Sequence, residues 1–228
     1  MRRRAVKSFT LLELIVVMGI LVLLSAVAIP AYSSLFSGRK TTLAANKLNG
    51  AVMEARSYAV SNKIYTGLVF LKEKVPNTSK DGFIRFRLAE LYHDPENKDS
   101  KYIWSRWANG SDFVLLPENT MIPDENKSFG TTTSDNSGSA SGDGDMPKVD
   151  FGLLKQANLP SDLTTSALTG AKCIIFRPNG QLASNEKSVI VQFVEANKYN
   201  GNAAEAAALP LRIHWLTCKT KFMDPTTN

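Results

Sequence analysis

The sequence has 228 residues, of which 43% are hydrophobic and 21% charged, and a formal net charge of +6. This length argues against two full domains and fits one globular domain of about 150 residues with an added segment. The charge does not by itself indicate nucleic-acid binding, because four basic residues lie in the first eight: Arg2, Arg3, Arg4 and Lys7. Without residues 1–8, 23 basic and 21 acidic residues remain, which is a net charge of +2.

The N-terminal segment is polarised, with the basic start followed by an uncharged stretch from Leu14 to Ala31. The run from Leu11 to Tyr32 is nearly long enough to cross a bilayer core of about 30 Å, and the basic cluster predicts a cytoplasmic N-terminus. Three interpretations compete: a plain transmembrane anchor, a secretory signal cleaved after Ala28, and a leader cut between Ser8 and Phe9.

Glu13 distinguishes these interpretations, because it lies near the start of the apolar run. A carboxylate costs about 2.5–3.5 kcal/mol at the centre of a membrane helix on insertion scales, so we expect it to have a partner. Neither a plain anchor nor an ordinary secretory signal requires such a residue.

The stretch FTLLELIVVMGIL, from Phe9 to Leu21, preceded by a short basic leader and a small residue, resembles the class III prepilin signal of type IV pilins and type II secretion pseudopilins. The resemblance implies that a membrane peptidase cuts between Ser8 and Phe9 and N-methylates Phe9. It also implies that Glu13, fifth from the cut, pairs with the terminal amine of a neighbouring subunit, and that Pro30 bends the helix. Ser8 departs from the family, which prefers Gly before the cut.

The same resemblance implies where the protein resides and what it contacts. We expect a single-pass bacterial inner-membrane protein with a periplasmic C-terminal domain, which enters a filament after assembly. Its expected partners are other pilins or pseudopilins, the prepilin peptidase and N-methyltransferase, and inner-membrane lipid. No catalysis and no cofactor are expected.

Helical periodicity continues beyond Pro30 to about Asn62. Apolar residues recur every three or four positions, at Leu35, Ala44, Leu48, Val52, Ala55 and Ala59. We therefore predict one helix whose first half enters the membrane and whose amphipathic second half packs on a soluble domain.

Short segments rich in β-branched and aromatic residues follow this helix and predict strands. They are residues 64–75, 83–93, 101–108, 112–117, 173–178, 188–195 and 211–222. The expected fold is α+β, a long helix packed on an antiparallel sheet, as in pilins. The expected organisation is a leader at 1–8, an assembly helix at 9–32, its amphipathic continuation at 33–62, and a globular domain at 63–228 with a disordered loop at about 128–146.

Two further stretches resemble the GspH/FimT family of minor pseudopilins and pilins. The first is the helix end with Ala55, Arg56, Ser57 and Ala59, and the second is the late strand and turn with Phe176, Pro178 and Gly180. Thr217-Cys218-Lys219 replaces the Thr-Gly-Arg-like element of that family. The resemblance implies a minor subunit at the filament tip, of either a secretion pseudopilus or a type IV pilus.

Cys173 and Cys218 are the two cysteines, and two alternatives remain for them. An oxidising periplasm would permit a disulfide, whereas the spacing equally fits two buried free thiols.

The last predicted strand is basic and aromatic, with Arg212, Trp215, Lys219 and Lys221 as possible contacts to single-stranded DNA. A DNA-uptake minor pilin is therefore an alternative function. The near-neutral mature charge favours instead a half-buried strand, with Leu211, Ile213 and Trp215 inward and a solvated basic tail.

The remaining polar residues carry no recognisable catalytic or metal-binding pattern. His93 and His214 have no second ligand at a suitable spacing, so we expect structural or solvent-facing roles. The polar residues Asp135, Asn136, Asp143 and Asp145 lack the spacing of an EF-hand, and no metal site is expected.

Overall fold

The computed structural model describes residues 11–223 except 77, 97–100, 125–127, 133–145, 155–158, 160, 162–167, 169, 185–186 and 202–207, and it omits the side chains of 27–38. The chain divides into two compact units, Met1–Arg39 and Lys40–Asn228. Helix α1, Leu11–Asn62, contributes residues to both units.

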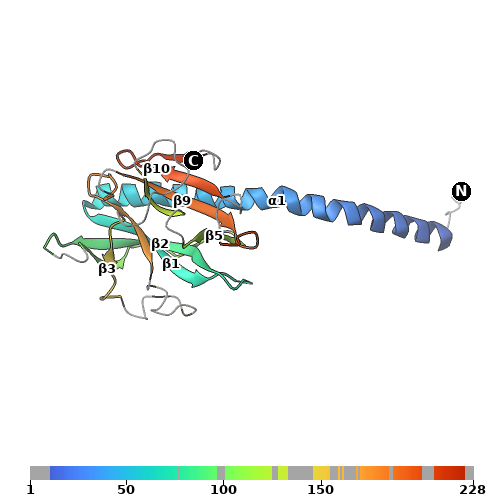
Figure 1. Ribbon diagram of the computed structural model, residues 1–228, viewed down its shortest axis with the longest axis horizontal. Coiled ribbons are helices and arrows are strands. Elements are labelled where there is room, and N and C mark those ends of the chain that lie inside the picture. Colours follow the sequence, from blue (N-terminus) through green and yellow to red (C-terminus); the bar gives the residue numbers. More distant parts are fainter. Residues whose placement is uncertain are drawn as a thin grey trace, which may run out of the picture. The chain divides into compact units, whose positions relative to one another are not determined.

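Within the second unit, α1 packs on a sheet through one face of the helix (Figure 1). The buried positions on this face have the three-to-four-residue spacing expected from the sequence: Ala44, Ala45, Leu48, Val52, Ala55 and Ala59. Alanine dominates the face, so the helix backbone can approach the strands closely. The helix ends at Asn62, and Lys63 follows with a φ of 54°. This left-handed conformation is typical of the residue after a helix.

Eleven strands are present among the described residues, and their bounds are as follows. They are β1 (Tyr65–Lys74), β2 (Asp81–His93), β3 (Tyr102–Trp107), β4 (Val114–Leu115), β5 (Thr120–Pro123), β6 (Phe129–Thr132), β7 (Val149–Asp150), β8 (Lys172–Phe176), β9 (Ser188–Glu195), β10 (Leu209–Ile213) and β11 (Thr220–Phe222). Their order is β11-β10-β9-β5-β2-β1-β8, with β3 and β4 beside β2, β6 beside β9 and β7 beside β3. Every pairing is antiparallel except β3 with β7. The α+β class expected from the sequence is confirmed.

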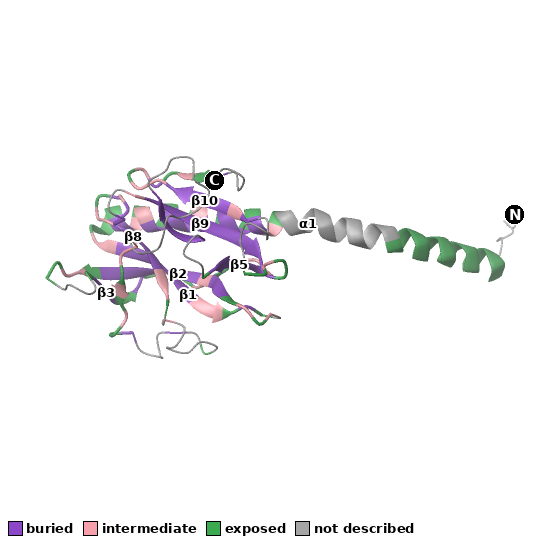
Figure 2. Cartoon of the chain, in the orientation of Figure 1, coloured by how far each residue is buried: buried purple, intermediate pink, exposed green. Residues whose placement is uncertain are grey.

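The sheet has hydrophobic clusters on both faces. The first cluster lies between the sheet and α1, and includes Phe70, Phe86, Ile174 and Phe193. The second covers the other face, with Val69, Leu71, Trp104 and Cys173, and with Leu154 and Leu159 from the segment after β7. Successive residues of β1 and β8 alternate between the clusters, as the two-residue period of a strand requires. Most strand residues of the second unit are therefore buried (Figure 2).

The start of the predicted disordered loop is wrong, because residues 129–132 form β6 and pair with β9. Phe129 is fully buried, with its ring centroid 4.8 Å from that of Phe70 and 5.7 Å from that of Phe83. Burial of this ring and the ladder with β9 order a stretch whose composition is otherwise polar. Met146, at the other end of the predicted loop, packs against the cluster facing α1. Residues 133–145 lie outside the described part of the chain.

The last predicted strand, residues 211–222, is also wrong, because it is an antiparallel hairpin of β10 and β11. The chain turns at Trp215–Thr217, and the Cys218 N–H donates to the His214 carbonyl at 2.8 Å. The turn at Pro178–Gly180 does not join β8 and β9 into a hairpin. It folds the chain back onto β8 as a single bridge at Leu182, and β9 pairs elsewhere.

Candidate functional site

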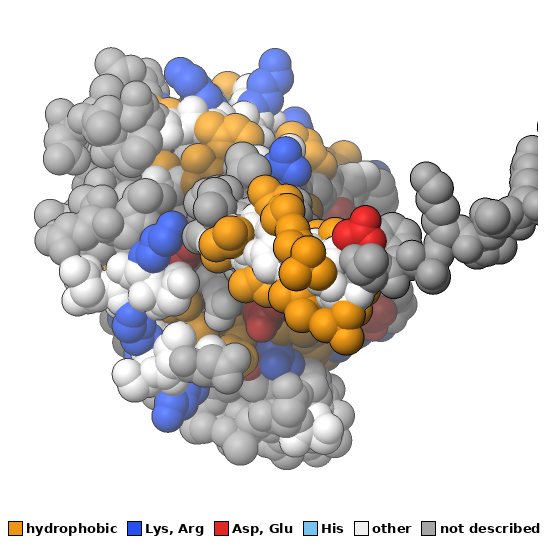
Figure 3. All heavy atoms as spheres, turned by 90° about the vertical axis from the view of Figure 1, so that its right-hand side faces the viewer, with side chains coloured by type: hydrophobic (Ala, Val, Ile, Leu, Met, Phe, Trp, Pro, Cys, Tyr) orange, Lys and Arg blue, Asp and Glu red, His pale blue; other side chains and the backbone are white. Residues whose placement is uncertain are grey.

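The N-terminal half of α1 has an apolar surface that no other described residue covers. Between Leu11 and Leu24, twelve large hydrophobic side chains are each 48–77% exposed. Figure 2 shows this half of the helix as exposed along its described length, and Figure 3 shows hydrophobic side chains gathered at this end of the molecule with an acidic one beside them. Glu13 lies in the first turn, where a carboxylate interacts favourably with the positive end of the helix dipole.

Several residues predicted for processing and assembly fall outside the described part of the chain. Ser8 and Phe9 precede it, so the cut between them stays a prediction. The helix continues through Pro30, but the side chain of Pro30 lies outside the description, and the bend also stays a prediction.

In the described part of the chain, no helix combines the length and the hydropathy of a membrane span.

The C-terminal hairpin is fastened to α1 by two polar contacts within the second unit. Arg56 donates from Nη1 to the Thr217 carbonyl at 2.6 Å, and Thr220 and Asn49 contact through their side-chain oxygens at 2.8 Å. A charge-assisted hydrogen bond of this kind is stronger than a neutral one. The Arg56 side chain thus fixes the turn between β10 and β11.

Because Gly180 has no side chain, the Arg56 side chain can pack directly against the turn. A Cβ atom at Gly180 would stand 3.1 Å from Arg56 Nε and 3.0 Å from Val60 Cγ2, and the φ of Gly180 is +80°. Both the close approach and the left-handed backbone favour glycine. The helix residue Arg56 and the turn residue Gly180, singled out in the sequence as separate markers, therefore belong to one contact region.

Cys218 occupies a left-handed position with a φ of 52°, where the resembled family has glycine. A non-glycine residue is strained in this conformation. The Cys218 side chain is fully buried, and its thiol donates to the Gly180 carbonyl at 3.2 Å. Burial raises the pKa of this thiol to about 11, although the nearby Arg56 lowers it.

The four residues predicted to contact DNA do not share one exposed strand. Arg212 is 8% exposed and donates from Nη2 to Ser188 Oγ at 3.1 Å, so the prediction that it contacts a phosphate is contradicted. Trp215 lies in the turn and packs partly against the core. Lys219 and Lys221 are exposed, as the solvated-tail alternative expects.

The possible disulfide between Cys173 and Cys218 is contradicted, because both thiols are free and buried. They belong to different hydrophobic clusters, Cys218 on the side of the sheet that faces α1 and Cys173 on the opposite side. The sheet itself separates them. Burial also raises the pKa of the Cys173 thiol well above its usual range.

Two solved structures resemble this chain at low similarity. The type IV minor pilin FimU of Pseudomonas aeruginosa is 11% identical with a TM-score of 0.40, and the match covers 84% of this chain and 94% of that one. The minor pseudopilin EpsH from the Type 2 Secretion System of Vibrio cholerae is 9% identical with a TM-score of 0.41, covering 83% and 99%. No protein family and no curated protein matches the sequence. Both scores and identities are low, so neither structure identifies the family.

A partly buried polar network that the sequence did not predict joins α1 to two strands. Tyr58 donates to Glu90 Oε1 at 2.7 Å, and Arg106 Nε donates to Glu90 Oε2 at 2.8 Å. The hydrogen bond to Glu90 raises the pKa of Tyr58, and burial adds to the effect. The only sequence signal was a glutamate at an otherwise apolar strand position.

The histidines lie among aromatic rings. The ring of His93 stacks on Tyr65 with centroids 4.9 Å apart, and that of His214 lies 6.2 Å from Trp215. Among the described residues, no three potential metal ligands lie together. The four polar residues weighed for calcium fall outside those residues.

Proposed function

We propose that this chain is a non-enzymatic subunit of a type IV pilin-like filament, and that the N-terminal half of α1 holds it in the assembly. The exposed apolar surface from Leu11 to Leu24 carries the proposal. Removing one such side chain from water is favourable by about 1.5–3 kcal/mol of free energy, so a surface of twelve such side chains must be covered. Bilayer lipid covers it before assembly, and the same helices of neighbouring subunits cover it afterwards.

Glu13 fixes the offset at which neighbouring helices pack along this apolar surface. A bundle of helices that carried only leucine and valine could slide, because such side chains pack without direction. In an apolar surrounding, the methylated amine that cleavage before Phe9 creates on a neighbouring subunit attracts this carboxylate. The offset that brings the two charges together is therefore favoured over other offsets.

The finer parts of the proposal come from the sequence. Cleavage between Ser8 and Phe9, the bend at Pro30 and a position at the filament tip all follow from the resemblance to pilins of the GspH/FimT kind. The domain from Lys40 onward then lies in the periplasm, where it serves a secretion pseudopilus or a type IV pilus as a minor subunit.

Replacing Glu13 tests the assembly role. We expect Glu13→Ala to leave the amount of chain in the membrane unchanged but to reduce co-purification with the pilin subunits of the same organism about tenfold or more. Glu54→Ala is the matched control, because Glu54 is an exposed carboxylate further along the same helix. Equal co-purification of the wild-type chain and Glu13→Ala would rule out a role for Glu13 in assembly.

The mature N-terminus separates the competing cleavage interpretations. After co-expression with a prepilin peptidase, mass spectrometry should find a chain that begins with methylated Phe9. A chain that begins at Ile29 would instead indicate secretory cleavage after Ala28 and would remove the whole apolar surface from the mature protein.

A further inference from the structure

The sequence contains four Asn-Gly pairs, which begin at Asn49, Asn109, Asn179 and Asn200. In such a pair, the amide side chain can react with the backbone nitrogen of the next residue, because glycine adds no side chain that obstructs the approach. The reaction is intramolecular, so its rate depends on whether the fold lets the two groups meet. The last pair adjoins residues 202–207, which lie outside the described part of the chain, and the structure ranks the other three.

Asn109 and Gly110 form the exposed tip of the turn that follows β3. The Ala108 N–H donates to the Leu88 carbonyl at 3.0 Å, and the Ser111 N–H donates to the Ala108 carbonyl at 3.1 Å. Gly110 has a φ of +76°, which suits the third residue of a type II turn. Both ends of the turn are therefore held, and the Asn-Gly pair between them meets water.

The two reacting groups of this pair are not engaged by other groups. Within the described ranges, neither the Asn109 side-chain amide nor the Gly110 N–H makes a hydrogen bond. Apart from its chain neighbours, a Cβ atom at Gly110 would have no other atom within 4 Å. The space around the Gly110 backbone is open, as the closing of a ring between the two residues requires.

The pairs at Asn49 and Asn179 are protected by comparison. Gly50 lies within α1, where each N–H donates to the carbonyl four residues earlier. The Gly180 N–H donates to the Arg177 carbonyl at 2.8 Å, and Asn179 Oδ1 already accepts a backbone N–H at 3.1 Å. Either pair must open locally before its amide and its backbone nitrogen can react.

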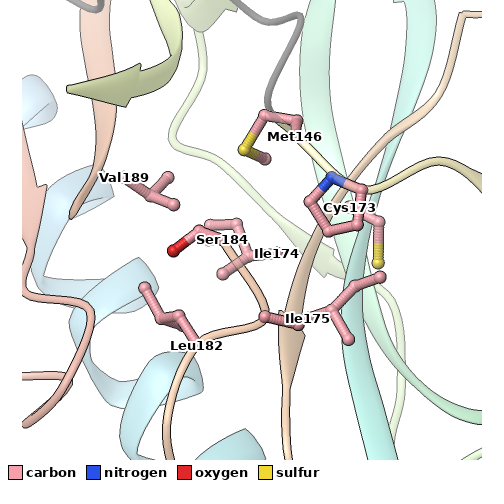
Figure 4. A pocket seen from close by; sticks show the side chains of 9 residues that line it. Met146, Cys173, Ile174, Ile175, Leu182, Ser184 and Val189 are labelled. Atoms are coloured by element: carbon pink, nitrogen blue, oxygen red, sulfur yellow. The ribbon is translucent and has the colours of Figure 1, made fainter. Parts of the chain in front are cut away.

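Two nucleophilic side chains near β8 show the opposite situation to Asn109. Cys173 and Ser184 border the small cavity in Figure 4, which is too small to admit a water molecule. The Ser184 hydroxyl donates to the Lys187 carbonyl, and burial raises the pKa of the Cys173 thiol well above its usual range. Asn109, in contrast, combines a reactive group with access to water.

We propose that Asn109 is a site of spontaneous deamidation, and that its isoaspartate product weakens the contact of this turn with α1. The Gly110 nitrogen attacks Asn109 Cγ, so that a new C–N bond forms and the bond from Cγ to Nδ2 breaks. The proton of the Gly110 nitrogen leaves with the amide group as ammonia. Water then opens the cyclic imide at either carbonyl and leaves aspartate or isoaspartate. The site belongs to the second unit and does not depend on the filament role.

The turn meets α1 at Tyr58. The pKa of Tyr58 is raised mainly by its hydrogen bond to Glu90, and a hydrogen bond from the backbone of Asn109 opposes this shift. The Asn109 backbone is therefore within hydrogen-bond reach of the Tyr58 hydroxyl. Isoaspartate lengthens the main chain at this residue by one carbon, which displaces the backbone group from the geometry that a hydrogen bond requires.

Peptide mapping measures the reaction at each pair, after incubation of the full chain in detergent micelles at mildly alkaline pH. In urea, Asn49, Asn109 and Asn179 should deamidate at similar rates, because each is followed by glycine and no structure remains. In the folded chain, Asn49 and Asn179 should slow by about tenfold or more, whereas Asn109 should stay within about threefold of its rate in urea. If Asn109 reacted no faster than Asn179 in the folded chain, the proposed site would be wrong.

The effect on α1 is tested with the isoaspartate product, separated by ion exchange. Its urea midpoint should lie below that of the unmodified chain, and the decrease should be at least about twice that measured in a Tyr58→Phe background, which lacks the hydroxyl. Asn109→Gln is the control, because its longer side chain closes such a ring far more slowly, and its midpoint should not change during the incubation. An equal decrease with and without the Tyr58 hydroxyl would overturn the link to α1.

Discussion

At the scale of single residues, Cys218 shows how a glycine position can accept a side chain. Its φ of 52° disfavours any Cβ, by about 1–2 kcal/mol in this region. Full burial of the side chain and the thiol contact with the Gly180 carbonyl offset that cost. The hydrogen bond from Arg56 to the Thr217 carbonyl also holds the backbone immediately before Cys218.

The balance at Cys218 predicts an unusual order of stability among variants. Cys218→Ala keeps the strain and loses the sulfur, so it should lower the free energy of unfolding by about 1–2 kcal/mol. Cys218→Gly releases the strain and should be the more stable of the two by about 1 kcal/mol. Urea unfolding measures both. Cys173, in the regular strand β8, is the control, and there glycine should be the less stable variant. The same order at both positions would contradict the role of the backbone.

The buried thiols predict low reactivity and a dependence of stability on alkaline pH. At pH 8 in the folded chain, Cys218 should react with iodoacetamide about 100-fold more slowly than in urea, because its pKa is about 11. The folded state holds the proton to higher pH than the unfolded chain does. This contribution to stability is therefore present below about pH 9 and is lost as the pH rises toward 11. Cys218→Ala should flatten that decline.

Peptide mapping without reductant should recover both cysteines unlinked, and a linked pair would contradict the separation of the two clusters.

At the scale of secondary-structure elements, the network around Glu90 connects α1 to β2 and β3. Tyr58→Phe removes one hydrogen bond from a carboxylate whose side chain is 12% exposed, so we expect a loss of about 1–2 kcal/mol in the free energy of unfolding. Arg106→Ala should cost less than about 1 kcal/mol, because that side chain is 60% exposed. Tyr92→Phe, at an exposed tyrosine of β2, is the control and should be neutral. A Tyr58→Phe variant as stable as wild type would exclude a stabilising role for this hydrogen bond.

The elements that could be predicted from the sequence are those whose own pattern decides their structure. The helix end at Asn62 and the whole of β9 follow from local sequence patterns, because the last turns of the helix bury one face and every residue of β9 is buried. β6 could not be predicted, since Gly130, Thr131 and Thr132 form a strand only through pairing with β9. The hairpin of β10 and β11 was hidden for a similar reason. No glycine marks its turn, and the left-handed residue is Cys218.

In the candidate site, single residues could be picked out from the sequence, but their contacts could not. Arg56 and Gly180 stood out through a family resemblance, but only the fold places them in contact. The separation of Cys173 and Cys218 needed the parity of β8, because one residue of shift would have moved Cys173 to the other face of the sheet. Burial of Arg212 likewise depends on its neighbour Ser188 in β9, which lies 24 residues away.

At the scale of the whole molecule, the two compact units predict two kinds of behaviour in one chain. Among the described side chains of α1, the buried ones begin at Thr41, so a fragment from Lys40 to Asn228 keeps all of these. It should remain monodisperse in gel filtration without detergent, whereas the full chain should require detergent because of its exposed apolar half. Its thermal midpoint should lie within about 4 °C of that of the full chain in the same detergent.

A second fragment, from Ala51 to Asn228, is the control for this comparison of thermal midpoints. It lacks Ala44, Ala45 and Leu48, all fully buried against the sheet. Losing a buried leucine alone costs about 2–5 kcal/mol, so this fragment should unfold at least about 10 °C lower than the one from Lys40. If the two fragments were equally stable, the first turns of the helix in the second unit would contribute nothing to its core. If the fragment from Lys40 were itself unfolded, residues before Lys40 would be part of the folding unit, and α1 could not serve as an assembly helix independently of the domain.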